Sequence, residues 1–170
     1  VYCEIHPYNK INIQFIEEFS PKGIILSGGP SSLTNSKSPK IDAEILKCNI
    51  PILGICYGEQ LICDLLGGSV SNSEHREFGR SNIIITENSK LFDNIWQKDS
   101  SYQVWMSHGD KVDSLPSGFK VIAKSDGAPF AAIENIEKQI YAVQFHPEVT
   151  HTPDGGKLIA NFVHNICNCS

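Results

Sequence analysis

The sequence has no long apolar run, no excess of positive charge and no repeated or low-complexity segment. A helix that spans a membrane needs about 20 consecutive apolar residues, so no such span is predicted. The formal net charge is −5, and we therefore expect no basic surface for nucleic acid. With 170 residues, of which 41% are hydrophobic and 19% charged, the chain has an ordinary globular composition. These features favour a single domain that binds a small or neutral ligand.

The six cysteines are scattered along the chain without framework spacing: Cys3, Cys48, Cys56, Cys63, Cys167 and Cys169. A domain of this size buries enough core to need no disulfides. No signal-like leader is expected, because residues 1–6 are predicted to form a strand. The C-x-C pair near the end has no two further ligands at zinc-finger spacing, so no metal site is predicted. We expect free thiols and a reducing, cytoplasmic location.

Strand and helix signals alternate along the chain. Short β-branched runs at residues 23–27 and 50–55 are bounded by glycine or proline and predict buried strands. Apolar residues at helical spacing follow in residues 57–66, and Gly67 ends that helix. Further strands are expected at 83–86, 119–123, 131–133 and 141–144, helices at 12–19, 42–47 and 158–166, and loops at 30–39 and 71–73. This order predicts an α/β sheet with an antiparallel extension.

Residues 52–60 (I-L-G-I-C-Y-G-E-Q) place Cys56 at the turn between a buried strand and a helix, with Gly54 and Gly58 on either side. This is the spacing of a nucleophile elbow, in which larger flanking side chains would collide with the neighbouring strand and helix. The helix N-terminus favours a thiolate, and the backbone N–H of Tyr57 could stabilise an oxyanion. A buried structural cysteine beside two turn glycines is the alternative interpretation.

Residues 141–148 (Y-A-V-Q-F-H-P-E) form a predicted strand that ends in a histidine and a carboxylate. In an extended chain, side chains two positions apart project to the same face, so Glu148 can reach His146. A nucleophile, a base and a carboxylate that orients the base make up a catalytic triad, here in the order Cys, His, Glu. His146 on its own would be interpreted as a core histidine, but the cysteine elbow favours the triad.

The string Ser27-Gly28-Gly29-Pro30 follows a predicted strand. Two glycines there let backbone N–H groups approach a ligand, so Gly29 is a candidate second oxyanion donor. A phosphate-binding loop of the Walker type needs a Gly-Lys-Ser/Thr ending, which is absent. The S-G-G-x-D-S loop of ATP pyrophosphatases needs an aspartate where Ser31 stands, which weakens a nucleotide-binding interpretation.

Together, the strings S-G-G-P, G-I-C-Y-G and Q-F-H-P-E resemble those of the class I (triad) glutamine amidotransferases. Three further strings are similar to the glutaminase domains of GMP synthetases: H-R-E-F-G at 75–79, W-M-S-H-G-D-K-V at 105–112 and V-T-H-T at 149–152. The resemblance covers essentially the whole chain in the correct order. It implies a three-layer α/β fold with an open, mostly parallel sheet, flanking helices and an antiparallel extension.

The resemblance also implies roles for individual residues. Cys56 would be the nucleophile, His146 the general acid and base, and Glu148 the residue that orients it. Gly29 and Tyr57 would supply the N–H groups of the oxyanion hole. The residues implied to bind glutamine are Gln60, Ser107, His108 and Asp110.

Asp110 is the expected partner of the substrate ammonium, although a turn acid before Lys111 is the simpler interpretation. Arg76 and His151 fit a face that meets a synthetase domain of the ATP pyrophosphatase type, or are only solvated. That domain would use ATP and Mg²⁺ to adenylate XMP and would combine it with ammonia to form GMP. No cofactor is implied for the glutaminase domain itself, and L-glutamine is its implied substrate.

Three departures from the family pattern affect these expectations. Glu59 occupies a position usually filled by methionine, next to the catalytic turn. The family begins with a further strand and helix, so residues 1–170 are interpreted as one amidotransferase domain without them, and without synthetase and dimerisation domains. A γ-glutamyl cysteine hydrolase and a catalytically silent regulatory module are the alternative functions.

Overall fold

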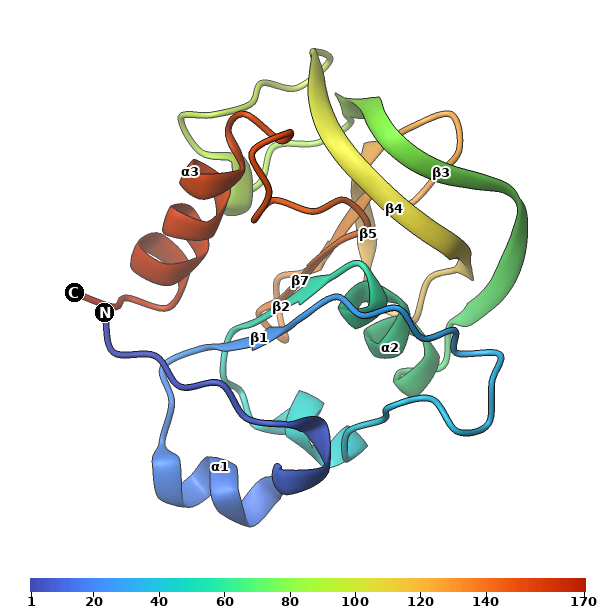
Figure 1. The fold of residues 1–170 in the computed structure, drawn as a ribbon. Helices are drawn as coiled ribbons and strands as arrows, with labels where there is room; N and C mark the ends of the chain where they lie inside the picture. Colours follow the sequence, from blue (N-terminus) through green and yellow to red (C-terminus); the bar gives the residue numbers. More distant parts are fainter.

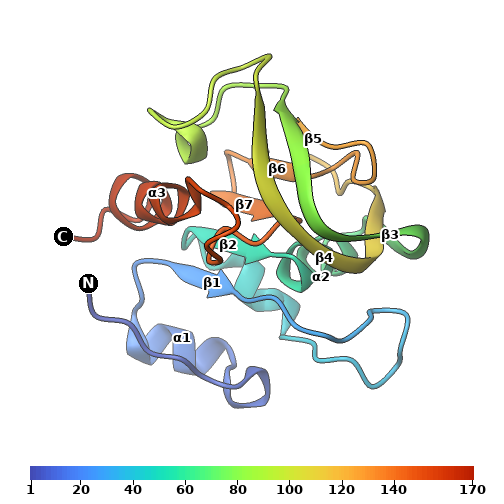
Figure 2. The same cartoon turned by 45° about the horizontal axis from the view of Figure 1, so that its top comes forward.

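Seven strands form one mixed sheet in the order β1-β2-β7-β6-β5-β3-β4 in the computed structural model, which describes residues 1–170. The parallel part consists of β1 (Ile24–Leu26), β2 (Ile52–Ile55) and β7 (Ile140–Val143). The antiparallel part consists of β6 (Ala132–Asn135), β5 (Lys120–Lys124), β3 (Ser69–Ile85) and β4 (Ser101–Ser114). Figures 1 and 2 show the long β3–β4 hairpin curving away from the parallel strands.

Helical segments pack on both sides of the sheet. The α-helices are α1 (Ile13–Phe19), α2 (Tyr57–Leu65) and α3 (Gly155–Ala160), which continues into the π-helix η4 (Asn161–Ile166). Short 3₁₀ helices are η1 (Tyr8–Lys10), η2 (Ala43–Lys47) and η3 (Lys90–Phe92). None of the helices combines the length and apolar character needed to cross a bilayer.

The buried side chains of the central strands alternate between two hydrophobic clusters, one on each face of the sheet. Leu53 and Tyr141 belong to the cluster that also contains Leu158 and Phe162 of the C-terminal helical segment. Their neighbours, among them Ile52 and Ala142, belong to the cluster that contains residues of α2 and η2. Because successive strand residues point to opposite faces, this division produces three layers.

The α/β class, the flanking helices and the antiparallel extension predicted from the sequence are confirmed. The sheet is mixed rather than mostly parallel, because only β1, β2 and β7 pair in parallel. The loop prediction for residues 71–73 is wrong, since they lie within β3, and β4 was not predicted at all. Both segments are polar, and a hairpin can satisfy their backbone groups whatever their side chains.

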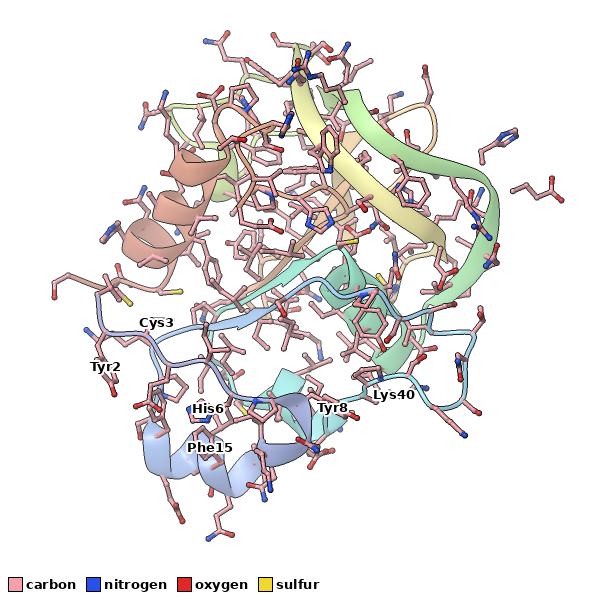
Figure 3. All side chains as sticks on the ribbon, viewed as in Figure 1. Tyr2, Cys3, His6, Tyr8, Phe15 and Lys40 are labelled. Atoms are coloured by element: carbon pink, nitrogen blue, oxygen red, sulfur yellow. The ribbon has the colours of Figure 1, made fainter.

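The strand predicted for residues 1–6 is absent. The segment is exposed and its backbone forms no strand pairing, so its apolar residues have no sheet neighbour against which to pack. It runs past α1, where the rings of His6 and Phe15 lie edge to face with centroids 4.7 Å apart (Figure 3). A strand is defined by its partner, and no partner strand lies beside these residues.

Candidate active site

Cys56 stands at the junction of β2 and α2 in a strained backbone conformation. Its φ of 52° and ψ of −104° fall outside the regions that side-chain-bearing residues normally occupy. A Cβ at Gly58 would clash with the carbonyl oxygen of Leu26, and one at Gly54 would lie 2.6 Å from Ile62 Cδ1. The predicted elbow geometry, with glycine required on both sides, is therefore confirmed.

The thiol of Cys56 is buried between polar groups from β4 and from the residue that follows β7. Its Sγ donates to the carbonyl oxygen of Ser107 at 3.4 Å, and Nε2 of Gln144 donates to Sγ at 3.5 Å. Gln144 was not recognised as a site residue from the sequence. A polar, fully buried residue at the end of an apolar strand is the signal that could have identified it.

His146 and Glu148 are brought together as predicted, but by a turn that follows β7 rather than by an extended strand, since β7 ends at Val143. Nδ1 of His146 lies 2.6 Å from Oε1 of Glu148. Burial is the largest single influence on the pKa of Glu148 and raises it, but the hydrogen bond from His146, a backbone hydrogen bond and the charge of His146 together lower that pKa. The Cys56 thiol and then Glu148 raise the pKa of His146 to about 10, against the opposing effect of burial. The ring is therefore protonated at neutral pH.

The other ring nitrogen of His146, Nε2, is buried and makes no hydrogen bond. The backbone around it is anchored independently of Glu148. Thr152 donates its hydroxyl to the carbonyl oxygen of His146 at 2.7 Å and accepts the N–H of Trp105 at 2.9 Å. The His146 N–H also donates to the carbonyl oxygen of Trp105. An unpaired N–H next to a cysteine is suitable for proton transfer to a group held between them.

Gly28 and Gly29 follow β1 and lie at the same edge of the sheet. A Cβ at Gly28 would approach His146 Cε1 to 3.0 Å and Cys56 Cβ to 3.5 Å, so Gly28 packs directly against both His146 and Cys56. The position of Gly29 is open, and its N–H makes no hydrogen bond to the backbone. Tyr57 occupies the first position of α2, where a backbone N–H has no acceptor within the helix.

Asp110 lies in β4 with a buried carboxylate that no lysine, arginine or histidine neutralises. Its Oδ2 accepts from Ser32 Oγ at 2.5 Å, and its Oδ1 from Asn72 Nδ2 at 3.3 Å. Nε2 of Gln60 donates both to the Asp110 carbonyl oxygen and to Gln144, each at 3.1 Å. A buried carboxylate held only by neutral donors has capacity for a cationic ligand.

His108 and Ser107 are placed differently from Asp110. The side chain of His108 is 1% exposed, and both ring nitrogens are occupied, by Glu77 and by the carbonyl oxygen of Asp110. It has no ring nitrogen left for a ligand. Ser107 is exposed, and its carbonyl oxygen accepts from the thiol of Cys56.

Arg76 and His151 are exposed and lie outside this cluster. The ring of His151 packs on Trp105 with centroids 4.6 Å apart. No group of three or more histidine, cysteine or acidic side chains is arranged to hold a metal ion.

Glu59 points into the interior of the protein from the first turn of α2. It is 1% exposed, its Oε2 has no hydrogen-bond partner, and burial raises the pKa of its carboxyl well above the ordinary value. The carboxyl is therefore neutral in the folded protein at pH values where it is ionised in the unfolded chain. An unsatisfied buried polar group of this kind costs about 1–3 kcal/mol.

We expect Glu59→Met to raise the free energy of unfolding by about 1–3 kcal/mol near neutral pH. Because the folded pKa is raised, the contribution of Glu59 is fully present below its unfolded pKa and is lost as pH rises towards the folded pKa. Urea unfolding at several pH values should therefore show the gap between variant and native protein widening with pH. Glu59→Gln, which removes the titration but keeps a buried polar group, is the control, and a gap independent of pH would contradict the assignment.

Comparison with known proteins gives a consistent result. The family model "Glutamine amidotransferase class-I" matches residues 1–166. A glutamine-hydrolyzing GMP synthase of Bartonella quintana is 53% identical over 166 residues, 98% of this chain and 32% of the relative. A solved structure described as a GMP synthase subunit from Thermoplasma acidophilum is 34% identical, with a TM-score of 0.75 over 92% of this chain and 77% of that chain. The chain thus spans about a third of the length of the curated relatives it matches.

Proposed function

Because the chain belongs to the class I glutamine amidotransferase family, we propose that it hydrolyses L-glutamine and supplies ammonia for the amination of XMP to GMP. The observation that carries this proposal is the strained Cys56 elbow beside His146, whose Nδ1 is bonded to Glu148 and whose Nε2 is buried and unpaired. The GMP synthases among its relatives support the acceptor, since they are 50% or more identical to nearly the whole chain.

In the proposed first step, the Cys56 thiolate attacks the side-chain amide carbon of glutamine. The carbonyl oxygen becomes an oxyanion that accepts from the N–H groups of Gly29 and Tyr57. Nε2 of the protonated His146 gives its proton to the amide nitrogen, the C–N bond breaks, and ammonia leaves a γ-glutamyl thioester. Losing one oxyanion donor costs roughly 10²–10³ in rate in comparable enzymes, so the placement of Gly29 controls the activity.

In the second step, neutral His146 takes a proton from water, which attacks the thioester carbonyl. The C–S bond breaks, glutamate leaves, and the thiolate and the imidazolium are restored. Glu148 keeps the ring in the orientation that directs Nε2 at the reacting atoms. The reaction needs no cofactor in this chain, and we assign ATP and Mg²⁺ to the synthetase.

The α-amino group of glutamine is assigned to Asp110. The buried carboxylate already accepts from Ser32 and Asn72, and an ammonium would supply the missing positive charge. The side-chain amide of Gln60 donates to the carbonyl oxygen of Asp110 and so holds that peptide in place. We assign Ser107 a role through its backbone carbonyl oxygen, which faces Sγ of Cys56.

Asp110→Asn is therefore expected to raise KM for glutamine by roughly one to three orders of magnitude, because a charged pair with the substrate is lost. The amide keeps the shape of the side chain, so kcat should fall much less. Steady-state kinetics of ammonia release would measure both constants. Asp113→Asn, an exposed acid on the same strand, is the matched control. An unchanged KM would show that Asp110 does not bind the ammonium.

The acceptor of ammonia is proposed to be a synthetase of the ATP pyrophosphatase type, fused or separate. Arg76 and His151 lie on exposed parts of the chain, and Phe78 on β3 is 67% exposed. We assign these residues to the face that meets the synthetase. The six cysteines are all free, which fits a reducing, cytoplasmic location.

Release of ammonia and glutamate from L-glutamine, with and without a synthetase loaded with ATP and XMP, tests the proposal. We expect release that the loaded synthetase accelerates. Preferential cleavage of γ-glutamyl peptides would instead indicate a peptidase. A folded protein that releases no ammonia under either condition would be a binding or regulatory module.

A further inference from the structure

The buried His108 and the partly buried Glu77 form a pair at the irregular point of the β3–β4 hairpin. They lie directly opposite each other in the ladder, and Asn72 lies opposite Asp110. Between these two rungs the register shifts, so that residues 73–76 of β3 face only Gly109 of β4. The two side-chain bonds on either side of the bulge, Glu77 to His108 and Asn72 to Asp110, therefore fix its geometry.

Both ring nitrogens of His108 have a hydrogen-bond partner. Nδ1 lies 2.8 Å from the carbonyl oxygen of Asp110, which can only accept, so Nδ1 is the donor in this contact. Nε2 lies 2.9 Å from Oε2 of Glu77. The hydrogen bond to His108 lowers the pKa of Glu77, which is therefore a carboxylate. The ring is thus held between the Glu77 carboxylate and the backbone of Asp110.

Glu77 is itself held from three directions. Its Oε1 accepts from Ser81 Oγ at 3.4 Å and from Ser125 Oγ at 3.5 Å. The backbone of Gly127 packs so closely on its carboxylate that a Cβ there would collide with it. The carboxylate thus connects the hairpin to the loop between β5 and β6, and its orientation is set by the fold rather than by solvent.

The pair acts on Asp110 through the backbone. His108 Nδ1 and Gln60 Nε2 both donate to the carbonyl oxygen of Asp110, from opposite elements of the structure. Two donors to one carbonyl oxygen restrict the rotation of that peptide. The direction of the carboxylate of Asp110 depends on this peptide, because its side chain has only two rotatable bonds.

We propose that Glu77 is a positioning residue for substrate recognition, which holds Asp110 through His108 so that its carboxylate meets the α-ammonium of glutamine. The inference rests on the proposed function and deepens it. Glu77 and His108 do not touch glutamine themselves, so their effect is confined to substrates that carry an α-amino group.

Glutaramate, which is glutamine without its α-amino group, separates this role from a general structural one. In the full chain, assayed with the loaded synthetase, Glu77→Ala should lower kcat/KM for L-glutamine on the order of tenfold or more, mainly through KM. It should leave kcat/KM for glutaramate unchanged. Asp110→Asn should produce the same loss of preference, and the double variant should lose no more than the larger single loss.

Glu77→Gln provides the rescue. Its amide can donate to Nε2 of a neutral His108, which keeps the Nδ1 proton and the bond to Asp110, so KM should return towards the native value. Glu74→Gln, an exposed acid in the same bulge, is the control. Equal losses for glutamine and glutaramate in Glu77→Ala would overturn the proposal and leave a structural role.

Nitrogen NMR of His108 tests the contact to Asp110 without any activity. We expect Nδ1 to be protonated both in the native chain and in Glu77→Gln. An unprotonated Nδ1 in the native chain would overturn the proposal. If the native protein released no ammonia from either substrate, the proposed function would fail, whereas this measurement would still decide whether His108 donates to Asp110.

Discussion

Replacing Cys56 with alanine is expected to lower the rate of ammonia release from L-glutamine by roughly 10⁵–10⁶-fold, while the fold is retained. The thiol is the attacking group of the proposed mechanism, and no neighbouring side chain can replace it. The Cys63 thiol is fully buried on the same helix, and burial raises its pKa. Alanine fits the elbow because only the Sγ atom is removed.

The strain at Cys56 gives this prediction a second, independent readout. At φ 52° and ψ −104° any side-chain-bearing residue is strained, whereas glycine is not. Cys56→Gly should therefore be more stable than Cys56→Ala by about 1 kcal/mol, although both are inactive. Thermal unfolding followed by circular dichroism would measure the difference. Cys48→Ala is the control for thiol loss, and residual Cys56-independent hydrolysis would disprove the nucleophile assignment.

His146→Ala is expected to reduce kcat by roughly 10⁵–10⁶-fold, and Glu148→Ala by a smaller factor of about 10³–10⁴. His146 donates a proton in the first step and accepts one in the second, whereas Glu148 only orients the ring. The difference has a structural cause, since Thr152 and Trp105 hold the backbone of His146 without Glu148. Kinetics of ammonia release would measure both losses.

The pH dependence of Glu148→Ala adds to this comparison. Glu148 is the second cause, after Cys56, of the high pKa of His146. Removing the carboxylate lowers that pKa, so the protonated ring needed to expel ammonia is lost at a lower pH. The alkaline limb of the kcat profile should move to lower pH. Glu87→Ala, an exposed acid outside the site, is the control. Equal losses in the two variants would mean that His146 has no support other than Glu148.

The elbow and the His146–Glu148 pair could be predicted because their geometry is local. A buried strand that runs into a helix places Cys56 at the turn, and Gly54 follows from contacts within this same segment, whereas Gly58 is required by Leu26 of β1. Likewise, His146 and Glu148 are only two residues apart, so the turn after β7 is enough to join them, although an extended strand was predicted there. Short-range spacing carries this information without any knowledge of the sheet order.

The strand that supplies the substrate pocket could not be predicted from its pattern. In β4, the buried positions alternate as expected for a half-buried strand, but two of them are His108 and Asp110. Polar residues at core positions conceal the period on which strand prediction depends. The site residue Gln144 was missed for a related reason, because its partners Cys56 and Gln60 come from a distant part of the chain.

The sequence by itself determined the chemical groups of this site, the turns that carry them and the family to which they belong. The tertiary structure decided which residues touch. Asp110 lies beside Ser32, 78 residues away, and Glu77 meets His108 only because the hairpin has one particular register. Register and long-range pairing depend on the summed burial and hydrogen bonding of the whole sheet, so no single segment of the sequence encodes them.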